Sequence, residues 1–151
     1  MSTLINHFYQ HYNTASRLLG QLHSLVSISA RLYIAQVFFL AGLTKIKDWD
    51  TTLFLFEEEY QVPLLPYELA AYLGTIGELL FPVLLAIGLT TRFSAAALSI
   101  VNIVAVISLE EIAPAAFYLH IVWGILLAQS IVYGPGILSI DRWLKSKWSS
   151  V

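Results

Sequence analysis

Four long apolar stretches, separated by short polar or charged connections, dominate the chain. They run over about residues 24–46, 67–88, 92–109 and 115–134. Each is close to the ~20 residues that an α-helix needs to cross a hydrocarbon layer of about 30 Å. This pattern predicts an all-α, polytopic membrane protein whose four spans pack as a four-helix bundle.

The connections between the stretches predict how the spans are joined. Residues 89–91 leave so little chain between the second and third stretches that these helices must form an antiparallel hairpin. The first connection is longer, and the apolar run 54–56 within it predicts a short helix at the membrane interface. The last span must end at Gly134, Pro135 and Gly136, which cannot continue a helix.

Three regions follow from these boundaries. Residues 1–23 form a cytoplasmic or interfacial segment, residues 24–134 the four-span domain, and residues 135–151 a basic and aromatic cytoplasmic tail. The first region lacks the short apolar core and small-residue cleavage site of a signal peptide. Its scattered apolar side chains indicate either an amphipathic helix on the membrane surface or an ordinary lead-in to the first span. They are Phe8, Tyr12, Leu18, Leu19 and Leu22.

The amino-acid composition favours a protein surrounded by lipid and excludes several classes of partner and chemistry. Hydrophobic residues make up 58% of the 151 residues and charged residues only 12%, which is far from the balance of a soluble domain. A net charge of −2 gives no basic field for nucleic acid. The absence of cysteine excludes disulfides, cysteine-ligated iron–sulfur clusters and thiol catalysis.

Lysine and arginine placement predicts the orientation in the membrane. Arg17, Arg92 and Arg142 fall on one side of the four spans, together with the other cations of the tail, whereas Lys45 and Lys47 fall on the opposite side. Because cytoplasmic loops carry the excess of basic residues, we expect both termini to be cytoplasmic.

Five of the polar residues inside the predicted spans are candidates for a functional role, because each is costly there unless it has a partner or a water-filled cavity. They are Arg31, Lys45, Glu78, Asn102 and His120. Helical spacing places Arg31 and Lys45 on one face of the first span, with small residues between them that admit a neighbouring helix. At about 1.5 Å per residue, Glu78 and Asn102 reach similar depths, so we expect a polar layer near mid-membrane. Gln36 shares that depth but points about 140° away from Arg31.

These residues have a functional and a structural interpretation. His120 and Glu78 could exchange protons, and an imidazole could hydrogen-bond a quinone or bind a metal. The structural alternative is that an arginine–glutamate pair and amide or imidazole hydrogen bonds only join helices. Lys45 is close enough to its helix end for the ammonium to extend to the interface. We predict no metal site, because His120 has no adjacent ligand and the pair His7 and His11 lacks a third.

The chain resembles the DoxX family of small four-helix bacterial membrane proteins. The resemblance covers roughly residues 31–142 and rests on the phrases RLYIAQVFFLAGLTKI, GTIGELLFPVLLAIGLTTR and GPGILSIDRW. The residues that match the family pattern are Arg31, Lys45, Glu78, Arg92, Gly134, Gly136, Ser139 and Asp141. The resemblance implies a bacterial inner-membrane location and an association with redox chemistry, because a related family forms the membrane subunit of a thiosulfate:quinone oxidoreductase.

Three functional hypotheses follow. The first is a membrane subunit or accessory protein of a redox, stress or metal-homeostasis system that binds a quinone without any covalently attached cofactor and works with a protein partner. The second is a non-enzymatic anchor or assembly partner that docks through the first connection, residues 48–60, and the aromatic tail, and a homo-oligomer is compatible with either. The third is a small proton-coupled transporter, for which Pro82 could kink the second span beside Glu78.

Overall fold

The computed structural model describes residues 2–136 and 138–148, with the side chains of residues 2–6 and 21 left out. Within these ranges the chain forms six α-helices and no strand, which confirms the all-α prediction. The helices are α1 (Ser2–Lys47), α2 (Trp49–Glu58), α3 (Tyr67–Ile87), α4 (Thr91–Ile107), α5 (Pro114–Tyr133) and α6 (Ile140–Trp148).

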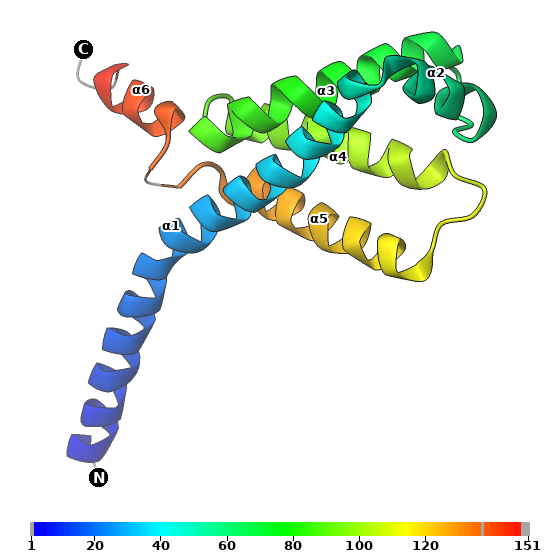
Figure 1. The fold of residues 1–151 in the computed structure, drawn as a ribbon. Helices are drawn as coiled ribbons and strands as arrows, with labels where there is room; N and C mark the ends of the chain where they lie inside the picture. Colours follow the sequence, from blue (N-terminus) through cyan, green and yellow to red (C-terminus); the bar gives the residue numbers. More distant parts are fainter. Residues whose placement is uncertain (1, 137, 149–151) are drawn as a thin grey trace.

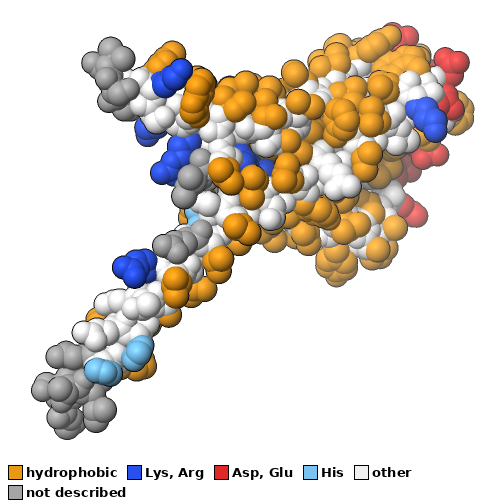
Figure 2. Space-filling view, turned by 60° about the vertical axis from the view of Figure 1, so that its left-hand side comes forward, with side chains coloured by type: hydrophobic (Ala, Val, Ile, Leu, Met, Phe, Trp, Pro, Cys, Tyr) orange, Lys and Arg blue, Asp and Glu red, His pale blue; other side chains and the backbone are white. Residues whose placement is uncertain are grey.

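Three helices are long and apolar enough to cross a membrane. They are α1 over His7–Lys47, α3 and α5, whereas α4 is apolar but has only 17 residues. The outer surface of the helical body carries many exposed hydrophobic side chains (Figure 2). A surface of this kind needs lipid rather than water around it, so the protein is an integral membrane protein.

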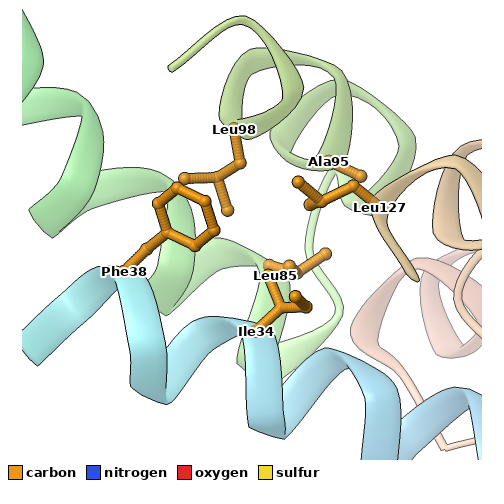
Figure 3. Packing of buried hydrophobic residues seen from close by; sticks show 6 residues of the cluster. All are labelled: Ile34, Phe38, Leu85, Ala95, Leu98 and Leu127. Carbon is orange, nitrogen blue, oxygen red and sulfur yellow. The ribbon is translucent and has the colours of Figure 1, made fainter. Parts of the chain in front are cut away.

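All four helices that correspond to the predicted spans meet in one core. Helix α1 packs against α3 and α5, and α4 packs between α3 and α5 (Figure 1). Figure 3 shows the six buried side chains that these helices contribute. They are Ile34, Phe38, Leu85, Ala95, Leu98 and Leu127. Each helix therefore has one inward apolar face and one outward face for lipid.

Helix α1 is much longer than the predicted first span. It begins at Ser2 instead of near Ser24, and its amino-terminal half projects away from the other helices (Figure 1). Nothing in this half stops a helix, because Gly20 is its only glycine and it contains no proline. The segment predicted as either a surface helix or a lead-in to the first span is therefore continuous with that span, and its Phe8, Tyr12 and Leu19 are exposed.

The predicted interfacial helix is α2, at the opposite end of the helical body from both termini (Figure 1). Asp48 begins it as an N-cap, since its carboxylate accepts a hydrogen bond from the Thr51 backbone N–H. The buried side chain of Phe56 packs against Ala70 and Ala71 of α3. These contacts hold α2 against the body.

Glycine and proline set the remaining boundaries. Gly88 ends α3 with φ of +72°, and the short turn to Thr91 makes α3 and α4 the predicted hairpin. Pro114 opens α5, and Gly134 ends it with φ of +78°. The chain then turns back so that α6 lies near the end of α3, which places both termini at the same end of the body (Figure 1).

Candidate functional site

Lys45 and Glu78 form an ion pair between α1 and α3. The Lys45 Nζ atom lies 2.5 Å from Glu78 Oε2, and the two side chains are 21% and 10% exposed. Gly42 lets α1 and α3 approach closely enough for this ion pair to form. A Cβ added at Gly42 would lie only 2.9 Å from Leu79 Cδ2, so a larger residue would push the helices apart. Pro82 has no N–H, so the Glu78 carbonyl also lacks its usual helical donor.

Asn102 on α4 orients His120 on α5. The Asn102 amide Nδ2 donates to the His120 backbone carbonyl at 3.0 Å, which leaves Oδ1 as the acceptor end of this amide. Oδ1 lies 2.8 Å from Nδ1 of the imidazole, so Nδ1 carries the proton. In the neutral ring Nε2 then keeps its lone pair. The indole of Trp123 packs edge-on against the same ring, with 4.8 Å between centroids.

The Lys45–Glu78 pair and His120 line one cavity of about 500 Å³. Apolar side chains make up most of its wall, among them Val37, Phe38, Phe56, Val101 and Val104. Tyr60 and Trp123 also line it. Burial and the charges of Glu59 and Glu78 raise the pKa of Tyr60, so its hydroxyl stays protonated at neutral pH. The cavity therefore combines apolar walls with a cation, a carboxylate, an imidazole and a phenol.

Arg31 lies at the other end of α1's buried face, away from this cavity. Its side chain is 1% exposed, and Nη2 donates to the Leu138 carbonyl at 2.7 Å. Nε and Nη1 are buried and have no hydrogen-bond partner among the described residues. Nη1 lies so close to Gly88 that an added Cβ there would be 2.2 Å away. Arg31 therefore connects α1 to the turn after α3 and to the chain before α6.

Asp141 joins the tail to the α3–α4 hairpin. Its two carboxylate oxygens accept hydrogen bonds from the backbone N–H groups of Thr90 and Thr91, at 2.7 and 2.8 Å. The Asp141 N–H donates to the Gly88 carbonyl at 2.9 Å. Asp141 thus supplies from α6 the cap that the α4 N-terminus lacks locally, since Thr90 makes no capping hydrogen bond of its own.

The other matched residues surround the same end of the body. The Arg92 guanidinium lies against Gly134, and its Nη2 donates to the Val132 carbonyl at 3.3 Å. Ser139 accepts a hydrogen bond from the Arg142 N–H and donates to the Gly136 carbonyl. The matched residues at this end therefore fix the turn between α5 and α6.

The structure corrects the predicted polar layer. Arg31, Lys45 and His120 do all point inward, but Glu78 pairs with Lys45, and Arg31 lies with the tail. The arginine–glutamate pair of the structural alternative does not form, and the Lys45 ammonium turns to Glu78 instead of extending to the interface. Gln36 is exposed, which agrees with its predicted angle. The predicted polar residues do not form one layer, because residues at the same predicted depth can face different neighbouring segments.

Two cavity residues were not anticipated from the sequence. Tyr60 and Trp123 line the cavity beside the Lys45–Glu78 pair, although neither is an ionisable residue within a predicted span. Trp123 lies one helical turn after His120, and that spacing was the one sequence feature that could have indicated it. His7 and His11 are exposed neighbours on α1, with ring centroids 5.8 Å apart. Over the described ranges, no three potential metal-ligating side chains gather at one point.

Comparison with known proteins identifies the family. The family model described as DoxX matches residues 26–111, which includes the first three core helices and the Lys45–Glu78 pair. A Haemophilus influenzae protein named only as uncharacterized is 31% identical over 124 residues, covering 76% of this chain and 80% of that protein. No solved structure matches the chain. The chain belongs to the DoxX family.

Proposed function

We propose that this protein is the membrane subunit of a redox system in the bacterial inner membrane and that it binds a quinone in the cavity beside Lys45. The observation that carries the proposal is that the Lys45–Glu78 pair and the oriented His120 line one apolar cavity of about 500 Å³. Ligand cavities commonly have volumes of about 300–1,000 Å³ and combine apolar walls with a few convergent polar groups.

The polar groups suit both oxidation states of a quinone. An oxidised quinone has two carbonyl oxygens that accept hydrogen bonds, and the Lys45 ammonium and Tyr60 hydroxyl can donate to them. A reduced quinol has two hydroxyls that donate, and the Nε2 lone pair of His120 can accept from one of them. Phe38 and Trp123 lie edge-to-face at 6.0 Å and offer aromatic surface for the ring.

Quinone reduction takes up two electrons and two protons. Lys45 and Tyr60 carry protons in the cavity wall, and the Glu78 carboxylate can accept the proton that a quinol releases. The chain has no cysteine for an iron–sulfur cluster, so in this proposal a protein partner supplies the electrons. Asn102 acts as a positioning residue, since it fixes the proton on His120 Nδ1 and leaves Nε2 as the acceptor.

The same proposal includes four membrane crossings with both termini in the cytoplasm. Helix α4 would be the fourth crossing, and its 17 residues extend about 26 Å. Arg92 and Arg142 lie at the end of the body where α6 packs, whereas α2 and its acidic side chains lie at the opposite end (Figures 1 and 2). This basic bias at one end favours that end as the cytoplasmic one.

The proposal is tested by measuring quinone carried by the protein through purification in mild detergent. Glu78→Gln and His120→Ala should each lower the quinone-to-protein ratio by about tenfold, which corresponds to ~1.4 kcal/mol of binding free energy. Gln36→Ala is the matched control, because Gln36 is an exposed polar residue on α1. Equal quinone content in all four proteins, or none in the native protein, would remove the quinone from the proposal.

One observation favours an assembly role as the second candidate. Phe54 on α2 is 59% exposed, and Glu57 and Glu58 are exposed beside it, whereas Trp49 and Phe56 pack on α3. An exposed aromatic residue among carboxylates suits the docking of a protein with a basic, apolar surface. Loss of a co-purifying protein in Phe54→Ser, with quinone content unchanged, would support this role.

The transporter hypothesis has less support, since α3 runs unbroken through Pro82.

A further inference from the structure

A second and larger cavity lies at the opposite end of the body from the proposed quinone site. It is an open groove of about 870 Å³ between α1, the α3–α4 hairpin, the end of α5 with the turn after it, and α6. Its charged lining consists of Arg92, Arg142, Lys145 and Asp141. Figure 2 shows Lys and Arg side chains gathered where α6 meets the body, on the side away from the acidic residues.

The two arginines in this groove carry positive charge that its carboxylate does not balance. Among the described residues of its lining, Asp141 is the one carboxylate, and both its oxygens already accept hydrogen bonds from the α4 N-terminus. Behind Asp141 lies the buried Arg31, whose Nε and Nη1 have no partner among the described residues. Arg92 and Arg142 make no ion pair within the described ranges. Such a groove favours an anion with several acceptor oxygens.

The position of the groove identifies which anion can reach it. Helix α3 ends, α4 begins and α5 ends around it, so it lies at the depth where membrane spans meet the lipid headgroups. Phe93 and Tyr133, both 65% exposed, line the groove and extend its wall with apolar surface. A lipid can therefore place its phosphate against the arginines while its acyl chains follow the outer faces of α4 and α5.

We propose that this groove binds the phosphate headgroup of an anionic phospholipid, with Arg92 and Arg142 as the guanidinium partners. A guanidinium presents two parallel N–H donors that match two phosphate oxygens, which a single ammonium does not. The lipid would hold α6 against the α3–α4 hairpin from outside, where Asp141 already does so from within. This site is independent of the proposed quinone cavity.

The test compares lipid binding by the full-length protein and two double variants. The purified proteins are titrated with phosphatidylglycerol or phosphatidylcholine in detergent, and bound lipid is counted by native mass spectrometry. We expect native protein to prefer phosphatidylglycerol and Arg92→Gln/Arg142→Gln to bind it about tenfold more weakly. Arg17→Gln/Lys47→Gln removes the same charge from exposed positions outside the groove and should behave as native.

Three outcomes would overturn the proposal. The first is an unchanged preference for phosphatidylglycerol in Arg92→Gln/Arg142→Gln, and the second is an equal loss in Arg17→Gln/Lys47→Gln. The third is full competition by inorganic phosphate at equal concentration, which would identify a free-anion site and not a lipid site. If the double variant does not fold, Arg142→Gln alone serves, since Arg142 is exposed and its side chain holds no helix in place.

Discussion

Lys45 and Glu78, 33 positions apart in the sequence, form an ion pair with 2.5 Å between Nζ and Oε2 inside the helical body. Replacing either side chain alone leaves the charge of the other partly buried and unpaired. We expect Lys45→Met or Glu78→Gln to cost about 3–5 kcal/mol. The double variant should cost much less than the sum, because it removes both charges together.

Thermal unfolding of the four proteins in detergent measures this coupling. Lys47→Met is the matched control, because Lys47 lies two residues away on α1 and is exposed. Its melting temperature should stay near that of the native protein. Additive losses in the double variant would mean that the two residues do not depend on each other.

The sequence was sufficient to predict the four core helices and their inward faces, but not the early start of α1 or the helix α6 in the tail. Arg31, Phe38 and Lys45 recur at helical spacing, and all three side chains do face the body. The apolar stretches predicted α3, α4 and α5 within a few residues, because glycine or proline stands near most of their ends. These features are local, so they can be read without knowing the neighbours of each helix.

Pairing between helices could not be predicted in the same way. Arg31 and Lys45 share a face but lie about 21 Å apart along α1. Which of them reaches Glu78 depends on the rotation and axial shift of α3 against α1, and neither periodicity nor depth fixes these. The contact of Arg31 with Leu138 also joins two segments 107 positions apart. The contacts of the tail with α1 and with the α3–α4 hairpin are therefore known only from the packed structure.

Gly88 is required by both its backbone and its neighbours. Its φ is +72°, and an added Cβ would lie 2.2 Å from Arg31 Nη1 and 2.6 Å from Ser139 Cβ. We expect Gly88→Ala to destabilise the protein by at least about 1–2 kcal/mol, since both strain and displacement of Arg31 contribute. Gly20→Ala is the control, because nothing lies within 4 Å of its added Cβ. That change should be neutral or stabilise α1 slightly in thermal unfolding.

Asp141 should control whether α6 stays attached to the hairpin. Asp141→Ala removes the acceptors for the Thr90 and Thr91 N–H groups and should cost about 1–2 kcal/mol. Limited trypsin digestion checks the local effect, because cleavage after Arg142 should become faster when α6 detaches more often. Glu111→Gln, an exposed change at the other end of the body, should leave the cleavage rate as it is. Equal rates for Asp141→Ala and native protein would show that other contacts hold α6.

The stabilisation of α2 by its N-cap Asp48 should depend on pH. The backbone N–H and hydroxyl of Thr51 hydrogen-bond its carboxylate and hold the pKa of Asp48 below its ordinary value. Because the folded pKa is lowered, the ionised carboxylate stabilises α2 above about pH 4, and this contribution is lost as the pH falls through the folded pKa.

Replacing Asp48 by alanine tests this dependence. The native protein should melt at a higher temperature than Asp48→Ala between pH 5 and 7, by a roughly constant margin, and the margin should shrink as the pH falls below about 4. Asp50→Ala, a neighbouring exposed carboxylate without a capping hydrogen bond, is the control and should show a smaller margin. A margin for Asp48→Ala that stays constant down to pH 3 would mean that the neutral carboxyl caps α2 as well as the ionised one.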